Sequence, residues 1–257
     1  MESTGMPRQS CSYCNGAGKI GWILKELCYA CDGTGYMEDQ RSFTATLTER
    51  RAYGQPHIIE VHKVTDSLPS AKVCSIEILA GGGEVFCQEL SRDGRLLAIS
   101  TNQPPYLTLW DTSTGRMCMD LQPHTEQYWK NLAFSPDNRF LAGGSNGDDP
   151  EPFVAKIWNV ADGAAIRSFP DSTSHSILNM AFSPDGQLLA TGNFLQPQIW
   201  RIQDGKLLQT LEEPGRYASG TKEKLRFSSD GRFIKARAYD SNIIWRVQDG
   251  KIVKMYK

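Results

Sequence analysis

Short apolar runs separated by polar turns recur along most of the chain. Between residues 178 and 211, such runs end near Phe182, Thr191, Trp200 and Leu211. Ser-Pro-Asp-Gly joins the first two runs and Gln-Asp-Gly joins the last two, and both are turn sequences. Runs of this length with turns on either side are typical of β-strands. The stretch therefore predicts four short strands connected by two tight turns and one longer loop.

Three markers of this unit repeat in phase along the chain. The turn aspartate recurs at intervals of 44, 48 and 45 residues, and a late tryptophan at intervals of 48, 42 and 45. The markers are Asp93, Asp137, Asp185 and Asp230; Trp110, Trp158, Trp200 and Trp245; and the turn glycines Gly115, Gly163, Gly205 and Gly250. Four strands repeating every ~40–45 residues indicate the blades of a β-propeller. We expect the four tryptophans to pack in the core between blades.

This repeat resembles the WD-repeat family over roughly residues 85–257, with Trp110-Asp111 as the one intact Trp-Asp pair. The other copies read Trp158-Asn159, Trp200-Arg201 and Trp245-Arg246. The resemblance implies an all-β fold, a WD-type β-propeller built from four-stranded blades.

The region before the repeat predicts a divergent first blade. Its strand-like runs are residues 43–47, 57–61 and 73–78, which are rich in β-branched residues at alternating positions. Counting this region gives about five blades. Because the last repeat has its own fourth strand at residues 251–257, we favour a ring that closes by packing of the first blade on the last. The alternative is an incomplete ring that another chain completes, which would make a homo-oligomer.

Four of the seven cysteines lie near the start of the chain as two Cys-x-x-Cys pairs. Cys11 and Cys14 are followed by Asn-Gly-Ala-Gly, and Cys28 and Cys31 by Asp-Gly-Thr-Gly. Two such pairs can offer four thiolates in a tetrahedron, which is the arrangement of a structural zinc ion. The glycines allow the backbone to turn sharply around the sulfur atoms. The spacing predicts one zinc ion per chain, and a disulfide or a redox Cys-x-x-Cys is the alternative.

The doubled Cys-x-x-Cys-x-Gly-x-Gly motif resembles the cysteine-rich zinc finger of the J-protein (DnaJ) co-chaperones. That family usually carries four copies of the motif and two zinc ions, whereas this chain has two copies. The chain lacks the His-Pro-Asp signature of a J domain, so stimulation of a heat-shock ATPase is not implied. We expect residues 1–42 to form a small zinc-binding hairpin module with its linker, and residues 43–257 to form the propeller.

Composition and charge narrow the function classes. The net charge is −1, so we expect neither nucleic acid nor a membrane surface as a partner. No apolar run approaches the ~18 residues of a membrane span, and residues 1–10 are too polar for a signal peptide, so we expect a cytoplasmic protein. The sequence contains no phosphate-binding loop, nucleophile elbow or histidine spacing typical of catalysis. We therefore expect no enzyme.

Candidate binding residues lie on the loops that vary between repeats. We place Trp129 there too, in an inter-blade loop outside the register of the repeated tryptophans. The candidates are aromatic or acidic: Tyr106, Tyr128, Trp129, Asp148, Asp149, Phe194, Tyr217 and Tyr239. Aromatic side chains beside acidic ones suit a protein or peptide partner that carries basic residues. The alternative for each aromatic residue is that it only covers the end of a blade.

Two functions of different classes follow. The first is a non-enzymatic protein–protein interaction scaffold, in which a structural zinc finger and a propeller present surfaces to a protein or peptide. The second is a chaperone-like or thiol–disulfide-active protein, in which the finger binds unfolded clients. Zinc-saturated thiolates that resist alkylation would count against the thiol-active version. Suppression of client aggregation by the purified protein would count against a scaffold alone.

Overall fold

The computed structural model describes the chain in segments. These are residues 19–20, 26–27, 43–49, 57–63, 71–78, 84–121, 128–145, 154–170, 177, 179–192, 197–212, 225–238 and 241–256. The chain divides into two units, Met1–Arg41 and Ser42–Lys257. In the first unit, β1 (Lys19–Ile20) pairs antiparallel with β2 (Glu26–Leu27). All regular structure in the described segments is strand, so the all-β prediction is confirmed for them.

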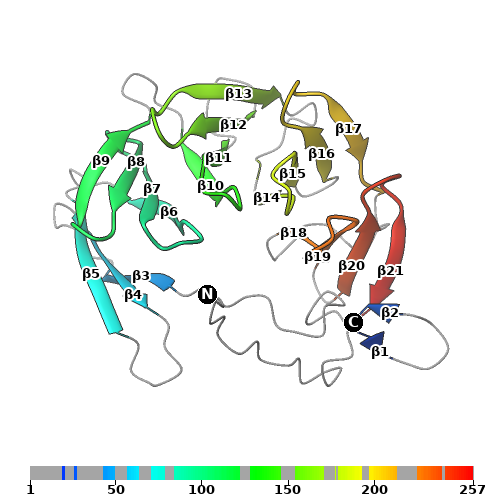
Figure 1. The fold of residues 1–257 in the computed structure, drawn as a ribbon, viewed down its shortest axis with the longest axis horizontal. Coiled ribbons are helices and arrows are strands. Elements are labelled where there is room, and N and C mark those ends of the chain that lie inside the picture. Colours follow the sequence, from blue (N-terminus) through cyan, green and yellow to red (C-terminus); the bar gives the residue numbers. More distant parts are fainter. Residues whose placement is uncertain are drawn as a thin grey trace, which may run out of the picture. The chain divides into compact units, whose positions relative to one another are not determined.

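Five antiparallel sheets make up the described part of the second unit (Figure 1). The first sheet contains β3 (Phe43–Glu49), β4 (His57–Lys63) and β5 (Ala71–Ile78). The second contains β6 (Val85–Leu90), β7 (Leu96–Thr101), β8 (Leu107–Asp111) and β9 (Arg116–Asp120). The third contains β10 (Trp129–Phe134), β11 (Phe140–Ser145), β12 (Val154–Asn159) and β13 (Ala165–Pro170). Strand order follows chain order in each sheet.

The fourth and fifth sheets repeat the same plan. The fourth contains β14 (Asn179–Phe182), β15 (Leu188–Gly192), β16 (Gln198–Arg201) and β17 (Leu207–Thr210). The fifth contains β18 (Arg226–Phe227), β19 (Phe233–Ala238), β20 (Ser241–Arg246) and β21 (Ile252–Tyr256). The strands predicted at residues 43–47, 57–61 and 73–78 are confirmed as β3, β4 and β5. The count of about five blades is confirmed as five sheets, of which the first has three described strands.

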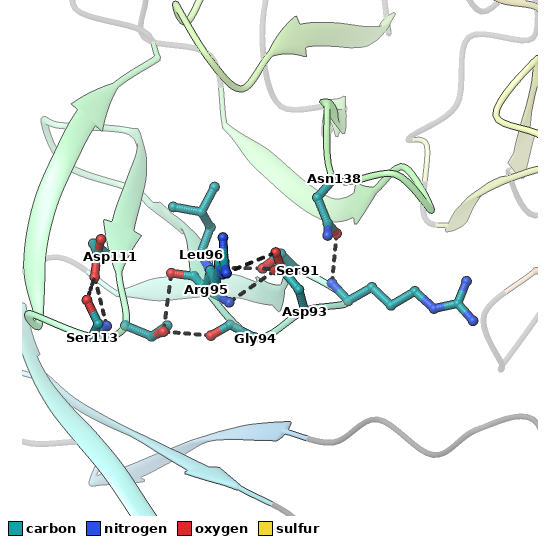
Figure 2. A network of polar contacts seen from close by, with 10 residues as sticks. Ser91, Asp93, Gly94, Arg95, Leu96, Asp111, Ser113 and Asn138 are labelled. Atoms are coloured by element: carbon teal, nitrogen blue, oxygen red, sulfur yellow. Dashed lines mark hydrogen bonds and ion pairs between the residues drawn. The ribbon is translucent and has the colours of Figure 1, made fainter. Parts of the chain in front are cut away.

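In each four-stranded sheet the same hydrogen-bonded turn joins the first strand to the second. In the fourth sheet, Ser183 Oγ donates to Asp185 Oδ1 at 2.5 Å and accepts from the Leu188 N–H at 2.9 Å. The turn needs a residue with positive φ, which is Gly186 at φ 69° here and Asn138 at φ 59° in the third sheet. Figure 2 shows the copy at Ser91 and Asp93 and the Asn138 side chain, whose Oδ1 accepts from the Arg92 N–H at 2.9 Å. The Ser-x-Asp sequence therefore fixes the turns, and Asn138 links the turn of the third sheet to that of the second.

The core consists of apolar layers between adjacent sheets. Each repeated tryptophan lies in the layer between its own sheet and the preceding one. Trp158, Trp200 and Trp245 are buried, and Trp110 is half-buried against the first sheet. Burying such large apolar side chains contributes much of the free energy that holds two adjacent sheets together. The prediction that these tryptophans form the core between blades is confirmed.

The first strands of successive sheets, β6, β10, β14 and β18, pack side by side, and Figure 1 shows them on the inner side of the sheets. Closure of a ring would require the first and fifth sheets to pack in the same way. Among the described residues no such closure is seen. The structure thus supports a WD-type arrangement of blades but not the closed ring that we favoured from the sequence.

Candidate functional site

Most of the predicted site residues lie outside the described residues. The four predicted zinc ligands, Cys11, Cys14, Cys28 and Cys31, belong to this group. So do five of the predicted partner-binding residues, namely Asp148, Asp149, Phe194, Tyr217 and Tyr239. Three predicted positions can be placed: Tyr106, Tyr128 and Trp129.

Tyr106 and Tyr128 come together although they lie before different strands of different sheets. Their ring centroids are 5.8 Å apart, with the ring planes at 63°. Phe86 joins them, because its ring centroid lies 5.8 Å from that of Tyr128 at an angle of 82°. The Lys130 ammonium lies over the Phe86 ring at 5.3 Å from its centroid. We call Phe86, Tyr106, Tyr128 and Lys130 the aromatic cluster.

Phe86 and Lys130 reach this cluster because of two equivalent β-bulges. The register of β6 against β7 shifts between Val85 and Cys87, which leaves Phe86 without an opposite residue. The register of β10 against β11 shifts in the same way around Lys130. A bulge re-aims the side chain of its extra residue. The sequence analysis missed both residues, since neither bulge is marked by a glycine or another recognisable signal.

A set of hydrogen bonds fixes the loop that carries Tyr106. The Thr101 hydroxyl shares its one hydrogen between two carbonyl oxygens, those of Gln103 at 2.7 Å and Pro105 at 2.9 Å. The Asn102 N–H donates to Glu84 O at 3.1 Å, and the Thr101 N–H donates to Tyr106 O at 3.0 Å. The Tyr106 backbone is therefore held by β7, so its ring is presented from a defined position. Phe86, Tyr106 and Tyr128 are all half-buried.

The placement of Trp129 in a surface loop is wrong. Trp129 is the first residue of β10 and is 0% exposed. Its ring packs edge to face with Trp158, with centroids 4.8 Å apart and planes at 88°. A side chain with no exposed surface cannot act as an anchor for a partner, so Trp129 belongs to the core. The sequence misled because Trp129 lies outside the register of the four repeated tryptophans.

The aspartates of the tight turns form hydrogen bonds and ion pairs within those turns. The Ser183 hydroxyl, which donates to Asp185, holds the pKa of that carboxyl below its ordinary value. Arg201 donates to Asp204 at 2.9 and 2.5 Å and likewise keeps the pKa of Asp204 well below its usual range. Arg246 pairs with Asp249 at 2.9 Å in the equivalent turn. These carboxylates therefore stabilise the turns.

The structure also places three cysteines outside the Cys-x-x-Cys pairs. Cys74 and Cys87 are half-buried, and Cys118 is exposed. Desolvation by burial raises the pKa of the Cys74 and Cys118 thiols. A raised pKa keeps a thiol protonated at neutral pH and lowers its reactivity. Within the described segments, no three His, Cys, Asp or Glu residues gather as metal ligands. Nor does any helix of membrane-spanning length and apolarity occur there.

The repeated four-stranded antiparallel sheets of the described segments are consistent with a protein of the propeller class. Residues 163–194 match the family model for the WD domain, G-beta repeat. They span the turn before β13, the strands β13 and β14, and β15. The match supports a WD-repeat protein, and WD repeats generally mediate protein–protein interactions. A comparison with curated proteins found no match.

Proposed function

We propose that this chain is a non-enzymatic scaffold that binds a protein or peptide partner through its loop face. The observation that carries the proposal is the meeting of Tyr106 and Tyr128, from two separate loops, with the Phe86 ring. Half-buried aromatic side chains fixed by their surroundings are typical anchors of protein interfaces, because they bury much apolar area at little cost in conformational entropy. The WD-repeat match agrees with such a role.

The variable loops that the sequence predicts on the same side of the blades would extend this surface. We propose that Phe194, Tyr217 and Tyr239 add aromatic contacts and that Asp148 and Asp149 attract a basic segment of the partner. Charges at the rim of an interface mainly raise the association rate and make it depend on salt. The aromatic cluster would then supply affinity and the acidic loop would supply steering.

The proposal is tested with a partner that co-purifies with the tagged full chain. Binding of that purified partner is measured by calorimetry for the native chain and for the Tyr106→Ser/Tyr128→Ser double variant. We expect the dissociation constant to rise about tenfold or more, as for interface anchors. Leu208→Ser is the matched control, because Leu208 is 37% exposed on the outer strand β17. Equal affinities for the native chain and the double variant would contradict the proposal.

We further propose that residues 1–42 bind one zinc ion through Cys11, Cys14, Cys28 and Cys31. The support is the spacing of the two Cys-x-x-Cys pairs and their paired glycines. A module this small cannot bury a core of its own, so zinc would supply most of its folding free energy. The finger would be a second protein-binding element joined to the propeller of residues 43–257.

A chaperone-like or thiol-active protein is the second candidate function. The doubled Cys-x-x-Cys-x-Gly-x-Gly motif favours it, because that motif resembles the client-binding finger of the J-proteins. The two candidates separate in an aggregation assay with an unrelated unfolded client. Suppression by the full chain that is lost in a chain without residues 1–42 would favour the chaperone-like role. No suppression, together with thiols that resist alkylation, would favour the scaffold.

A further inference from the structure

The first sheet corresponds to the second, third and fourth strands of the other sheets. In three of the four complete sheets an alanine of the second strand faces an apolar residue of the third, and the pairs are Ala98–Leu109, Ala142–Ile157 and Ala190–Ile199. The fifth sheet has Lys235–Ile244 at this place. In the first sheet the matching pair is Ala45 of β3 and Val61 of β4. The pairing of Ala45 with Val61 therefore places β3 in the position of a second strand.

The bulge of the first sheet gives the same alignment. In the second sheet the register shifts between Leu109 and Trp110, where the third strand pairs with the fourth. In the first sheet it shifts between Val61 and His62, where β4 pairs with β5. Packing agrees as well, because β3 lies beside β6 as the second strands β7 and β11 lie beside β10 and β14. Among the described residues, no strand takes the first position next to β3.

The register also fixes which backbone groups face that open position. In the second sheet, Leu96 O accepts from Ser91 at 2.8 Å and the Asn102 N–H donates to Glu84 O at 3.1 Å, so both residues point toward the first-strand side. Ala98 lies between them with the same alternation. Its counterpart Ala45 therefore directs its N–H and C=O away from β4, toward the open edge of β3. By the same alternation, we expect Thr44 and Thr46 to make the bonds to β4.

Gln88 of the neighbouring sheet lies against this edge. Its Nε2 donates to Ala45 O at 3.0 Å. Its Oε1 is buried and accepts no hydrogen bond. A buried acceptor without a donor costs about 1–3 kcal/mol, so this amide is half-satisfied. A donor group of a segment added at the edge would satisfy this oxygen.

Burial at the edge differs from that of the complete sheets. The equivalent alanines, Ala98, Ala142 and Ala190, are 0% exposed. Ala45 is only half-buried, and Thr44 and Thr46 are exposed. The first sheet thus follows the plan of the others, but no strand of the described segments lies where its first strand would be.

We propose that an extended peptide segment of a partner protein adds to the open edge of β3 as an antiparallel first strand. A single strand fits better than the sheet of a second copy. The first strands β6, β10, β14 and β18 already lie side by side on the inner side of the sheets (Figure 1), so further strands behind the added one would meet them. Backbone hydrogen bonds would supply affinity, and alternate side chains would supply selectivity.

The register defines the chemistry of the segment. The residue opposite Ala45 would face the second sheet. In the complete sheets that are followed by another sheet, this place is taken by Glu89, Ala133 and Ala181. Two of these three residues are small and apolar, so we expect a small residue to fit best beside the half-buried Ala45. Its neighbours would lie beside the exposed Thr44 and Thr46, which favour β-branched or polar partners across the strand. This edge is a different surface from the aromatic cluster, and the proposal does not depend on that cluster.

The test uses a phage-displayed dodecapeptide library, panned on the full chain, and synthetic copies of the enriched peptides. Ala45→Pro removes the N–H that points to the open edge and leaves the bonds from β3 to β4 in place. We expect it to weaken peptide binding about tenfold or more. Glu77→Pro is the matched control at the opposite edge of the same sheet, and binding should stay within about twofold. The Ala45 amide should exchange fast in the free chain and slowly with peptide.

Four results would overturn the proposal. One is equal binding of the peptides to the native and Ala45→Pro chains. Another is slow exchange of the Ala45 amide in the free chain, because a segment of the chain itself would then occupy the edge. The third is a concentration-dependent dimer that Ala45→Pro abolishes, which would make a second copy the occupant. Loss of peptide binding in Tyr106→Ser/Tyr128→Ser alone would assign the peptides to the aromatic cluster and count against the edge.

Discussion

Trp129 and Trp158 pack edge to face in the layer between the second and third sheets, with ring centroids 4.8 Å apart and planes at 88°. Such pairs add about 0.5–1.5 kcal/mol to the free energy of burial. Trp158 is one of the four repeated tryptophans, whereas Trp129 has no counterpart in the other three repeats. The pair therefore gives this joint an aromatic core that the repeat alone does not provide.

Trp129→Ala should destabilise the second unit by about 3–5 kcal/mol, as do other truncations of large core residues. The reason is the complete burial of Trp129. Denaturant unfolding followed by circular dichroism measures the change. Tyr106→Ala is the comparison, since Tyr106 is half-buried and should cost much less. Unchanged stability of the Trp129→Ala chain would contradict the burial of Trp129 in the core.

Gly143→Ala should also destabilise the protein. A Cβ atom at Gly143 would lie 2.9 Å from Trp129 Cε3 and 3.0 Å from Trp158 Cζ3. Overpacking of this kind costs about 1–3 kcal/mol, which exceeds the ~0.5–1 kcal/mol that alanine gains over glycine in the unfolded chain. In a Trp129→Leu background the cost should fall, because the closest ring is removed. A double-mutant cycle by denaturant unfolding checks this, and fully additive costs would contradict the contact.

The turns and the repeated core could be predicted from the sequence because their causes are local. The Ser-x-Asp turns bond within a few residues, and Trp158, Trp200 and Trp245 recur at a fixed place in a strand. Trp129 could not be placed in this way, since its burial depends on Gly143 and Trp158 from two other strands. The position of Trp129 along the chain suggested a loop, but its contacts with residues of neighbouring strands bury it.

The candidate site was predictable only in part. Tyr106 and Tyr128 follow from the rule that variable loops gather on one side of the blades, and the structure brings their rings together. Phe86 and Lys130 enter through bulges in β6 and β10, which depend on strand register and have no local signal. The open edge of β3 likewise requires register, because only the pairing of Ala45 with Val61 identifies β3 as a second strand.

Ser183→Ala should lower the free energy of unfolding and make it less dependent on pH in the acid range. The Ser183 hydroxyl is the largest cause of the lowered pKa of Asp185. A carboxyl whose pKa is lower in the folded than in the unfolded state stabilises the fold above its unfolded pKa of ~3.9. That stability is lost as the pH falls through the folded value. We therefore expect the free energy of unfolding of the native protein to fall as the pH is lowered below about 4. In the Ser183→Ala chain, Asp185 should contribute less to this fall.

Denaturant midpoints between pH 7 and pH 2.5 measure both effects. At pH 7 the variant should lose about 1–3 kcal/mol, because the Leu188 N–H also loses its acceptor. Asp185→Asn is the companion variant, since it removes the titrating group and keeps a side-chain oxygen. Identical pH profiles for the native, Ser183→Ala and Asp185→Asn chains would show that this turn does not contribute to acid sensitivity.

The last prediction concerns the cysteines of the first unit. Purified protein should contain one zinc ion per chain by elemental analysis, and Cys28→Ser should lower that content, because four thiolates are needed to complete a tetrahedral structural site. Cys118→Ser is the matched control, since Cys118 is exposed on β9 and should leave the zinc content unchanged. Chelation should remove the zinc and keep most of the β-sheet signal, because the sheets of the second unit have their own core. Protein without zinc, or a zinc content equal in native and Cys28→Ser chains, would leave the two Cys-x-x-Cys pairs to disulfide or redox chemistry.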